Sequence, residues 1–240
     1  MNRLHVSACL ILLTAVGLVG CGQGESGKAQ VWVTRDRGAT LLGAGTVPGG
    51  LTALQGLDRV AKVGTGYGGG FVTEIDGVAG SQLYQRDWFF FINGYEADRG
   101  ADSYRLRAGD VEWWDYRSWR GSERMPLVVG AFPEPFLHGY DGKRRVAAVR
   151  FGRGLGAEAH ALARIVRARS VAAIGRTVAP AANLLVVIGG RPGMVAQSRG
   201  EERAGEPVRF VVRGRDFARA LARNPGLVRY RYQAAGWNSP

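Results

Sequence analysis

Two segments between residues 88 and 116 carry the strongest apolar pattern in the chain. Residues 88–92, W-F-F-F-I, form an uninterrupted aromatic and β-branched run, which is typical of a strand with apolar neighbours on both faces. Asn93-Gly94 follows, with residues that tolerate positive φ. Residues 111–116 alternate, so that Trp114 and Tyr116 share one face. The pattern predicts two strands of one sheet whose faces are rich in aromatic side chains.

The residues before this pair predict a small sheet around one helix. Residues 30–34 and 39–46 alternate around a turn, which predicts a β-hairpin. Residues 51–63 have apolar positions at helical spacing behind a capping box formed by Thr52 and Gln55. We expect no regular structure in the glycine-rich residues 64–70 and a strand at residues 71–75. Together these elements predict a β-grasp-like domain, a mixed sheet around one helix.

The second half of the chain has a different pattern, in which strand-like and helical segments alternate. Helices are predicted at residues 157–169 and 217–224. This alternation favours a small α/β domain after the β-grasp-like one, so the fold class as a whole is α+β. The strand-like segments are residues 127–132, 145–151, 171–174, 184–188, 208–212 and 227–232.

The charge of the chain changes between these two halves. The net charge is +12, and residues 121–240 alone carry 20 basic and 8 acidic side chains. This step predicts a domain boundary near Arg120, with residues 30–119 as the first domain and 120–240 as a basic second domain of no recognised family. Outside the cell such a domain would meet anionic polymers or lipid headgroups, and nucleic acid is not an expected partner. The charge is equally compatible with a merely solvated surface.

The beginning of the chain predicts export and a lipid anchor. An apolar run at residues 10–19 is too short to span a bilayer and indicates a signal peptide, residues 1–20. Residues 18–21, L-V-G-C, resemble the bacterial lipobox, so Cys21 would carry the lipid and residues 21–29 would form a flexible tether. We therefore expect an extracytoplasmic lipoprotein held at the bacterial cell membrane. The alternative is an ordinary secreted protein in which Cys21 is a stray cysteine.

A family resemblance rests on the two aromatic strands. The sequences W-F-F-F-I-N-G-Y at residues 88–95 and L-R-A-G-D-V-E-W-W at 106–114 resemble the C-terminal domain of transcobalamin-type proteins, which uncharacterised bacterial lipoproteins also carry. The resemblance covers residues 30–119. It implies the soluble-ligand-binding β-grasp fold and cobalamin as a candidate ligand. Transcobalamin holds its ligand against a large helical domain that is not found in this sequence, so a partner chain would have to supply the other wall.

The aromatic side chains of this region are the candidate binding residues. They exceed what a small domain needs for packing, and exposed aromatics beside a glycine-rich loop suit a flat or partly apolar ligand, or a protein. An aromatic residue within the glycine-rich loop could instead pin that loop down, and we slightly favour this for Tyr67. The predicted ligand-binding residues are Tyr67, Trp88, Phe90, Tyr95, Trp114 and Tyr116.

Catalytic chemistry finds little support in the sequence. His138 and His160 lack neighbours that would make a catalytic or metal motif, and the glycine loop at residues 152–156 lacks the spacing of a nucleotide-binding loop. We predict a non-enzymatic, lipid-anchored binding protein that requires no cofactor and no metal. The alternative is a structural or interaction lipoprotein of the cell envelope, whose basic half binds an anionic polymer and whose first domain contacts an envelope protein. An enzyme built around residues 152–156 ranks last.

Overall fold

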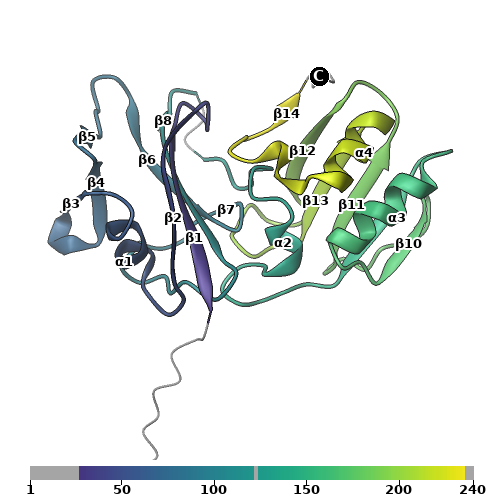
Figure 1. The fold of residues 1–240 in the computed structure, drawn as a ribbon, viewed down its shortest axis with the longest axis horizontal. Helices are drawn as coiled ribbons and strands as arrows, with labels where there is room; N and C mark the ends of the chain where they lie inside the picture. The colour runs from purple at the N-terminus through teal and green to yellow at the C-terminus, as the bar shows by residue number, and fades with distance from the viewer. Residues whose placement is uncertain (1–26, 122–123, 236–240) are drawn as a thin grey trace, which may run out of the picture.

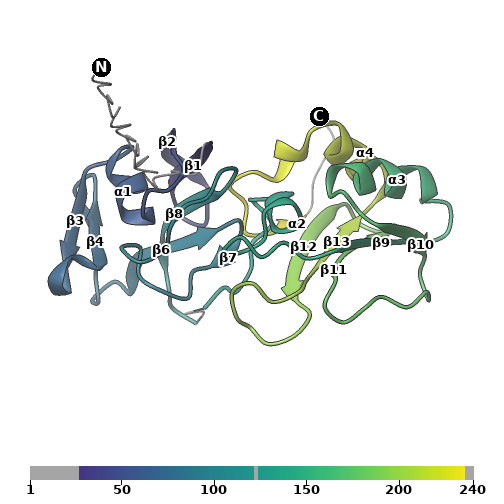
Figure 2. The ribbon, with the colours of Figure 1, turned by 90° about the horizontal axis from the view of Figure 1, so that it is seen from below.

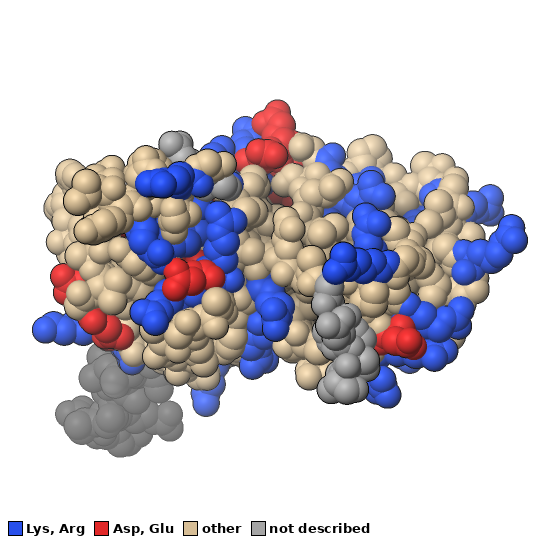
Figure 3. All heavy atoms as spheres, turned by 90° about the horizontal axis from the view of Figure 1, so that it is seen from above, with Lys and Arg blue, Asp and Glu red and all other residues tan. Residues whose placement is uncertain are grey.

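Two sheets, one in each half of the chain, dominate the computed structural model, which describes residues 27–121 and 124–235. Figure 1 shows the two halves side by side, with α2 (Glu134–Leu137) between them. Strands and helices are mixed in the manner of an α+β protein, as predicted. Basic side chains are spread over the second half on the face that Figure 3 shows, where few acidic ones lie among them.

The first sheet contains five strands in the order β2-β1-β8-β6-β7. The predicted hairpin is β1 (Lys28–Arg35) with β2 (Thr40–Pro48), paired antiparallel. β8 (Val111–Ser118) runs parallel to β1 and antiparallel to β6 (Arg86–Ile92), and β7 (Tyr95–Glu96) follows β6 through the Asn93-Gly94 turn. The sheet is therefore mixed, and the two aromatic strands predicted from the sequence are neighbours within it.

One face of the first sheet is covered by α1 (Ala53–Asp58) and a small second layer of strands. The layer comprises β3 (Val63–Gly66), β4 (Phe71–Ile75) and β5 (Val78–Ala79), joined by a short 3-10 turn at Tyr67–Gly69. The capping box of α1 is present as predicted. The predicted helix at residues 51–63 is too long, because the chain leaves the helix to pair in the β3–β4 ladder. That ladder also gives regular structure to part of the glycine-rich segment, where we expected none.

The second sheet has the order β10-β9-β11-β13-β12-β14. Its parallel centre begins with β9 (Ala147–Phe151), which is joined to β10 (Ser170–Ala173) through α3 (Gly156–Ile165). Figure 2 shows α3 and α4 on the same side of this sheet. The remaining elements are β11 (Asn183–Ile188), β12 (Gly193–Ser198), β13 (Val208–Arg213), α4 (Arg215–Arg223), the 3-10 helix η2 (Pro225–Val228) and β14 (Ala234–Ala235).

Two predicted strands of the second half, residues 127–132 and 227–232, are wrong. The first forms turns apart from a single bridge between Leu127 and Tyr95, and the second is η2 followed by loop. Their apolar side chains instead cover the other face of the first sheet. Val128, Tyr232 and Ala131 pack with Trp32, Phe91 and Trp113 in one buried cluster. All six residues of 127–132 are buried, because Leu127, Val129 and Phe132 pack in the larger core cluster. The apolar run thus reflects burial on both sides and not a strand.

The two halves are consequently joined by a shared packed layer. The backbone N–H of Val128 donates to the carbonyl of Gly94 across the two halves, and within the second half the backbone N–H of Val129 donates to the carbonyl of Tyr232. Trp113, which lies at the centre of the layer, is completely buried. The boundary near Arg120 that the charge step predicts stays a prediction, which a truncated chain would test.

Candidate functional site

The four predicted aromatic residues on β6 and β8 share one face of the first sheet. Trp88 is opposite Tyr116, and Phe90 is opposite Trp114. The rings of Phe90 and Trp114 stack with centroids 4.6 Å apart, and those of Trp88 and Tyr116 lie 5.2 Å apart. The alternation read from the sequence therefore gave the correct face for each.

Most of this face is not available to a ligand. Trp88 and Trp114 are only 5% and 3% exposed, so they belong to the core and not to an open surface. The reason is the small layer above them: the indole N–H of Trp88 donates to the Val78 carbonyl at 2.8 Å, and the Tyr116 hydroxyl donates to the Ala79 carbonyl at 3.1 Å. Phe90 and Tyr116 are half-buried. These aromatic side chains therefore pack β5 and α1 onto the sheet.

Tyr95 lies in the contact between the two halves and is buried. Its ring packs edge-on against Tyr140 with centroids 5.7 Å apart, and its hydroxyl donates to the carbonyl of Glu206 at 3.3 Å. Burial raises the pKa of this hydroxyl. The residue therefore connects the first sheet to the second half.

Tyr67 is the predicted site residue that stands free of the core. It is 93% exposed, and its ring meets that of Phe71 edge to face with centroids 5.9 Å apart. An aromatic peg holding the loop down would be buried, so that expectation is wrong. Tyr67 and Phe71 instead form an exposed aromatic tip at the end of the β3–β4 layer.

Glu112 is a buried carboxyl group that the sequence interpretation passed over. The indole N–H of Trp114 donates to Oε1 at 2.5 Å, while Oε2 has no hydrogen-bond partner within the described residues. Gly56 of α1 packs directly above it: a Cβ at Gly56 would lie 2.8 Å from Oε2. Desolvation raises the pKa of Glu112 well above its usual value.

We expect Glu112→Gln to stabilise the protein at neutral pH. A carboxyl whose pKa is raised by folding contributes stability that is fully present below its unfolded pKa and lost as the pH rises through its folded pKa. The amide cannot ionise, so at pH 7 the free energy of unfolding should increase by about 1 to 3 kcal/mol. Denaturant unfolding from pH 4 to 8 measures this, and the gain should shrink toward pH 4. A variant equally destabilised at all pH values would contradict it.

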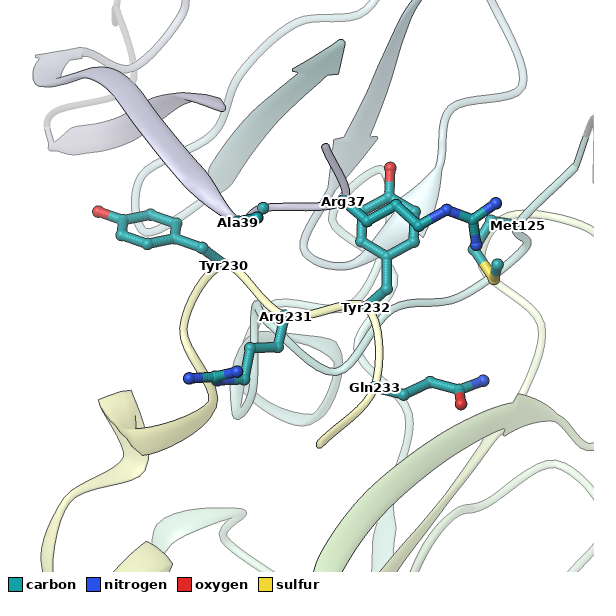
Figure 4. Close-up of a pocket in the computed structure, with 8 residues that line it drawn as sticks. Arg37, Ala39, Met125, Tyr230, Arg231, Tyr232 and Gln233 are labelled. Carbon is teal, nitrogen blue, oxygen red and sulfur yellow. The ribbon is translucent and has the colours of Figure 1, made fainter. Parts of the chain in front are cut away.

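A pocket with a charged lining lies where the β1–β2 turn meets the C-terminal segment. Its volume is about 360 Å³, within the range of small-molecule sites. Figure 4 shows the side chain of Arg37 lying across Tyr232 toward Met125, while Tyr230 and Arg231 point to other sides. The Arg37 guanidinium carbon is 5.9 Å from the Tyr232 ring centroid. The lining residues are Arg37, Gly38, Ala39, Met125, Tyr230, Arg231, Tyr232 and Gln233.

Asp115 forms hydrogen bonds to both segments that line this pocket. One oxygen accepts from the Thr34 hydroxyl at 2.6 Å and the Gly38 N–H at 2.9 Å; the other accepts from the Arg37 N–H at 3.1 Å and the Tyr232 hydroxyl at 3.0 Å. One carboxylate thereby fixes both walls. The Tyr230 carbonyl approaches so closely that a Cβ at Gly38 would lie 1.5 Å from it, so only glycine fits there.

The charges around the pocket leave its mouth cationic. The lining contains two arginines and no acidic residue, and the oxygens of Asp115 are occupied by the four donors just described. Burial and the nearby Asp115 carboxylate raise the pKa of Tyr232, so its hydroxyl remains protonated. The site can therefore accept a small anion beside the Tyr232 ring. The sequence offered only one signal for it, the polar Asp115 between aromatic neighbours.

The other candidate residues have ordinary surroundings. His138 Nδ1 lies 2.5 Å from Glu134 Oε2, which raises the pKa of His138, and the Gly154 carbonyl of the glycine loop accepts from Arg215 at 2.9 Å. Within residues 27–121 and 124–235 there is no group of three or more metal-ligating side chains. None of the helices in the described part of the chain has the length and apolar character needed to cross a membrane. Cys21 lies outside the described residues.

Comparisons with known proteins place part of the chain in a family of unknown function. A family model described as a domain of unknown function, DUF4430, matches residues 50–118, within the span of the transcobalamin-type resemblance. No curated protein matches the chain. A solved structure from Ruminococcus gnavus ATCC 29149, described as a "putative metal binding protein", is 17% identical over 39% of this chain and 98% of that one, with a TM-score of 0.32. Likeness at that level carries no argument about function.

Proposed function

We propose that this chain is a non-enzymatic, lipid-anchored extracytoplasmic protein that holds a small soluble ligand between its two halves. The observation that carries the proposal is the pocket at Arg37 and Tyr232, whose walls come from both halves of the chain. A module of the transcobalamin type needs a second wall for its ligand, and here the C-terminal segment of the same chain would provide it. A partner chain is then unnecessary.

The pocket favours a small anion with a flat or apolar part. Arg37 offers a planar cation, while the Tyr232 ring and Met125 offer apolar surface. Cobalamin, which the resemblance implies, is larger than this pocket. It would have to be bound from outside the pocket, for which the exposed tip at Tyr67 and Phe71 offers an aromatic surface.

The test uses the full chain carrying Cys21→Ser, so that no lipid can be attached to it. The probe is 1-anilinonaphthalene-8-sulfonate, a flat apolar anion whose fluorescence rises on binding. We expect saturable binding that Arg37→Ala weakens at least fivefold, whereas Arg35→Ala leaves it unchanged. Arg35 is a matched control because it is an exposed arginine at the end of β1 that does not line the pocket.

Two outcomes would contradict the proposal. Equal weakening by both variants would mean that only net charge matters, and the absence of saturable binding would remove the site. Hydroxocobalamin is titrated in parallel, with tryptophan fluorescence as the signal. If Tyr67→Ala abolishes the quenching and Arg37→Ala does not, the ligand binds at the aromatic tip and not in the pocket.

A further inference from the structure

The first sheet has one long edge whose outer side is unpaired. In the strand order β2-β1-β8-β6-β7, β2 has β1 as its neighbour and no described strand on its other side. β2 has nine residues, whereas the opposite edge strand, β7, has two. Outside the β1–β2 ladder, no described backbone hydrogen bond involves residues 40–48. The backbone groups on the outer side of β2 are therefore available for pairing.

The ladder shows which residues of β2 present those groups. The backbone N–H of Gln30 donates to the segment that leads into β8, so the next residue, Val31, directs its N–H and C=O toward β2. Val31 is opposite Gly45, whose own groups therefore point to β1. Ala44 and Thr46, on either side of Gly45, direct their N–H and C=O away from the sheet, and both residues are exposed.

This edge lacks the charged side chains that usually protect a long edge strand from pairing. No Asp, Glu, Lys, Arg or His occurs between Arg37 and Asp58. Leu41 and Leu42 add apolar surface, because they are 49% and 41% exposed. The irregularity of the ladder lies beside these leucines at one end of the strand, and Pro48 lies at the other. The middle of β2 therefore has no feature that prevents pairing.

We propose that β2 pairs antiparallel with β2 of a second copy of this chain, which joins the two first sheets into one continuous sheet. A two-fold axis near Ala44 lets the same strand serve both sides of the contact, as in other symmetric dimers. The outward groups of Ala44 and Thr46 in each copy then meet those of the other copy. This contact is separate from the pocket at Arg37.

The side chains and the charge of the chain favour a second copy as the occupant. Gly43, Ala44 and Gly45 form no pockets, so this edge offers a foreign peptide no side-chain recognition and is read through its backbone alone. The net charge of +12 makes two copies repel each other over most of their surfaces. The uncharged segment between Arg37 and Asp58 is where two copies can approach with little repulsion. An acidic partner would instead be attracted to the arginines elsewhere.

The first experiment measures the mass of the full chain carrying Cys21→Ser by size-exclusion chromatography with light scattering, over a series of protein concentrations. We expect a reversible dimer that Ala44→Lys weakens at least tenfold, because it brings two positive charges together at the axis. Ala173→Lys should weaken it less than threefold. Ala173 is a matched control because it is an exposed alanine on β10, an edge strand of the second sheet.

The second experiment tests where the two copies touch. Cys9→Ser with Cys21→Ser leaves a chain without cysteine, to which Ala44→Cys or Ala173→Cys is added. The two copies of residue 44 should lie roughly 5 to 8 Å apart, so a short bis-maleimide should link Ala44→Cys into a dimer. Ala173→Cys should stay a monomer under the same conditions.

Thermal melting first establishes that the lysine variants fold, and Thr46→Lys takes the place of Ala44→Lys if the latter does not. A chain that remains a monomer at every concentration would overturn the proposal. Equal weakening by the two lysine variants would overturn it too, because the added charge alone would then explain the effect. Equal linking of the two cysteine variants would show random collision in place of a β2 contact.

Discussion

A chain that ends at Arg120 should not unfold cooperatively when it is heated, although the full chain should. Removing residues 121–240 uncovers Trp32, Phe91 and Trp113, which are at most 5% exposed in the full chain. Each large side chain that returns to water costs about 1.5 to 3 kcal/mol, and a domain has only about 5 to 15 kcal/mol in total. Asp115 also loses the Tyr232 hydroxyl, one of its four donors.

The measurement is thermal unfolding of residues 22–120 beside the full chain carrying Cys21→Ser, followed by near-ultraviolet circular dichroism of the tryptophans. A cooperative transition with native-like tryptophan signals would contradict this expectation. It would establish the boundary near Arg120 that the charge step predicts. Full-length Tyr232→Ala provides a graded version of the same test, because it removes one ring and one hydroxyl while leaving the rest of the covering layer in place.

The change in charge near Arg120 and the packed layer between the two halves illustrate what the sequence could and could not predict. Hairpin β1–β2, the aromatic strands β6 and β8, and the parallel strands of the second half follow from alternation and turn residues, which are local properties. Residues 127–132 and 227–232 are also locally apolar, but Val128, Ala131 and Tyr232 pack on strands of the first sheet that are not adjacent to them in sequence. A local apolar pattern indicates which side chains are buried, but it does not indicate which part of the chain covers them.

The candidate site shows the same limit. The sequence placed Trp88, Phe90, Trp114 and Tyr116 on one face correctly, because alternation determines the face. It could not show that β5 would cover that face, since β5 is a strand of two residues, Val78–Ala79, with no pattern of its own. The pocket at Arg37 joins a turn to a segment close to the other end of the chain, so no spacing in the sequence reveals it.

Replacing Trp114 with alanine should cost about 3 to 5 kcal/mol of the free energy of unfolding, the usual range for a buried tryptophan. Three contributions combine at this residue. The side chain is 3% exposed, its ring stacks on Phe90 at an interplanar angle of 14°, and its indole N–H donates a hydrogen bond to the Glu112 carboxyl. Losing that donor leaves a buried carboxyl without a partner, which adds to the cost of the cavity.

Tyr67→Ala is the matched control for this prediction, because it removes an aromatic ring from the same half of the chain at a position that is 93% exposed. It should change the free energy of unfolding by less than about 0.5 kcal/mol. Urea denaturation of both variants, followed by far-ultraviolet circular dichroism because one variant lacks a tryptophan, gives the two values directly. An unchanged value for Trp114→Ala, or losses of similar size in both variants, would mean that Trp114 is not part of the core. The aromatic face of β6 and β8 would then again be a candidate surface for the ligand.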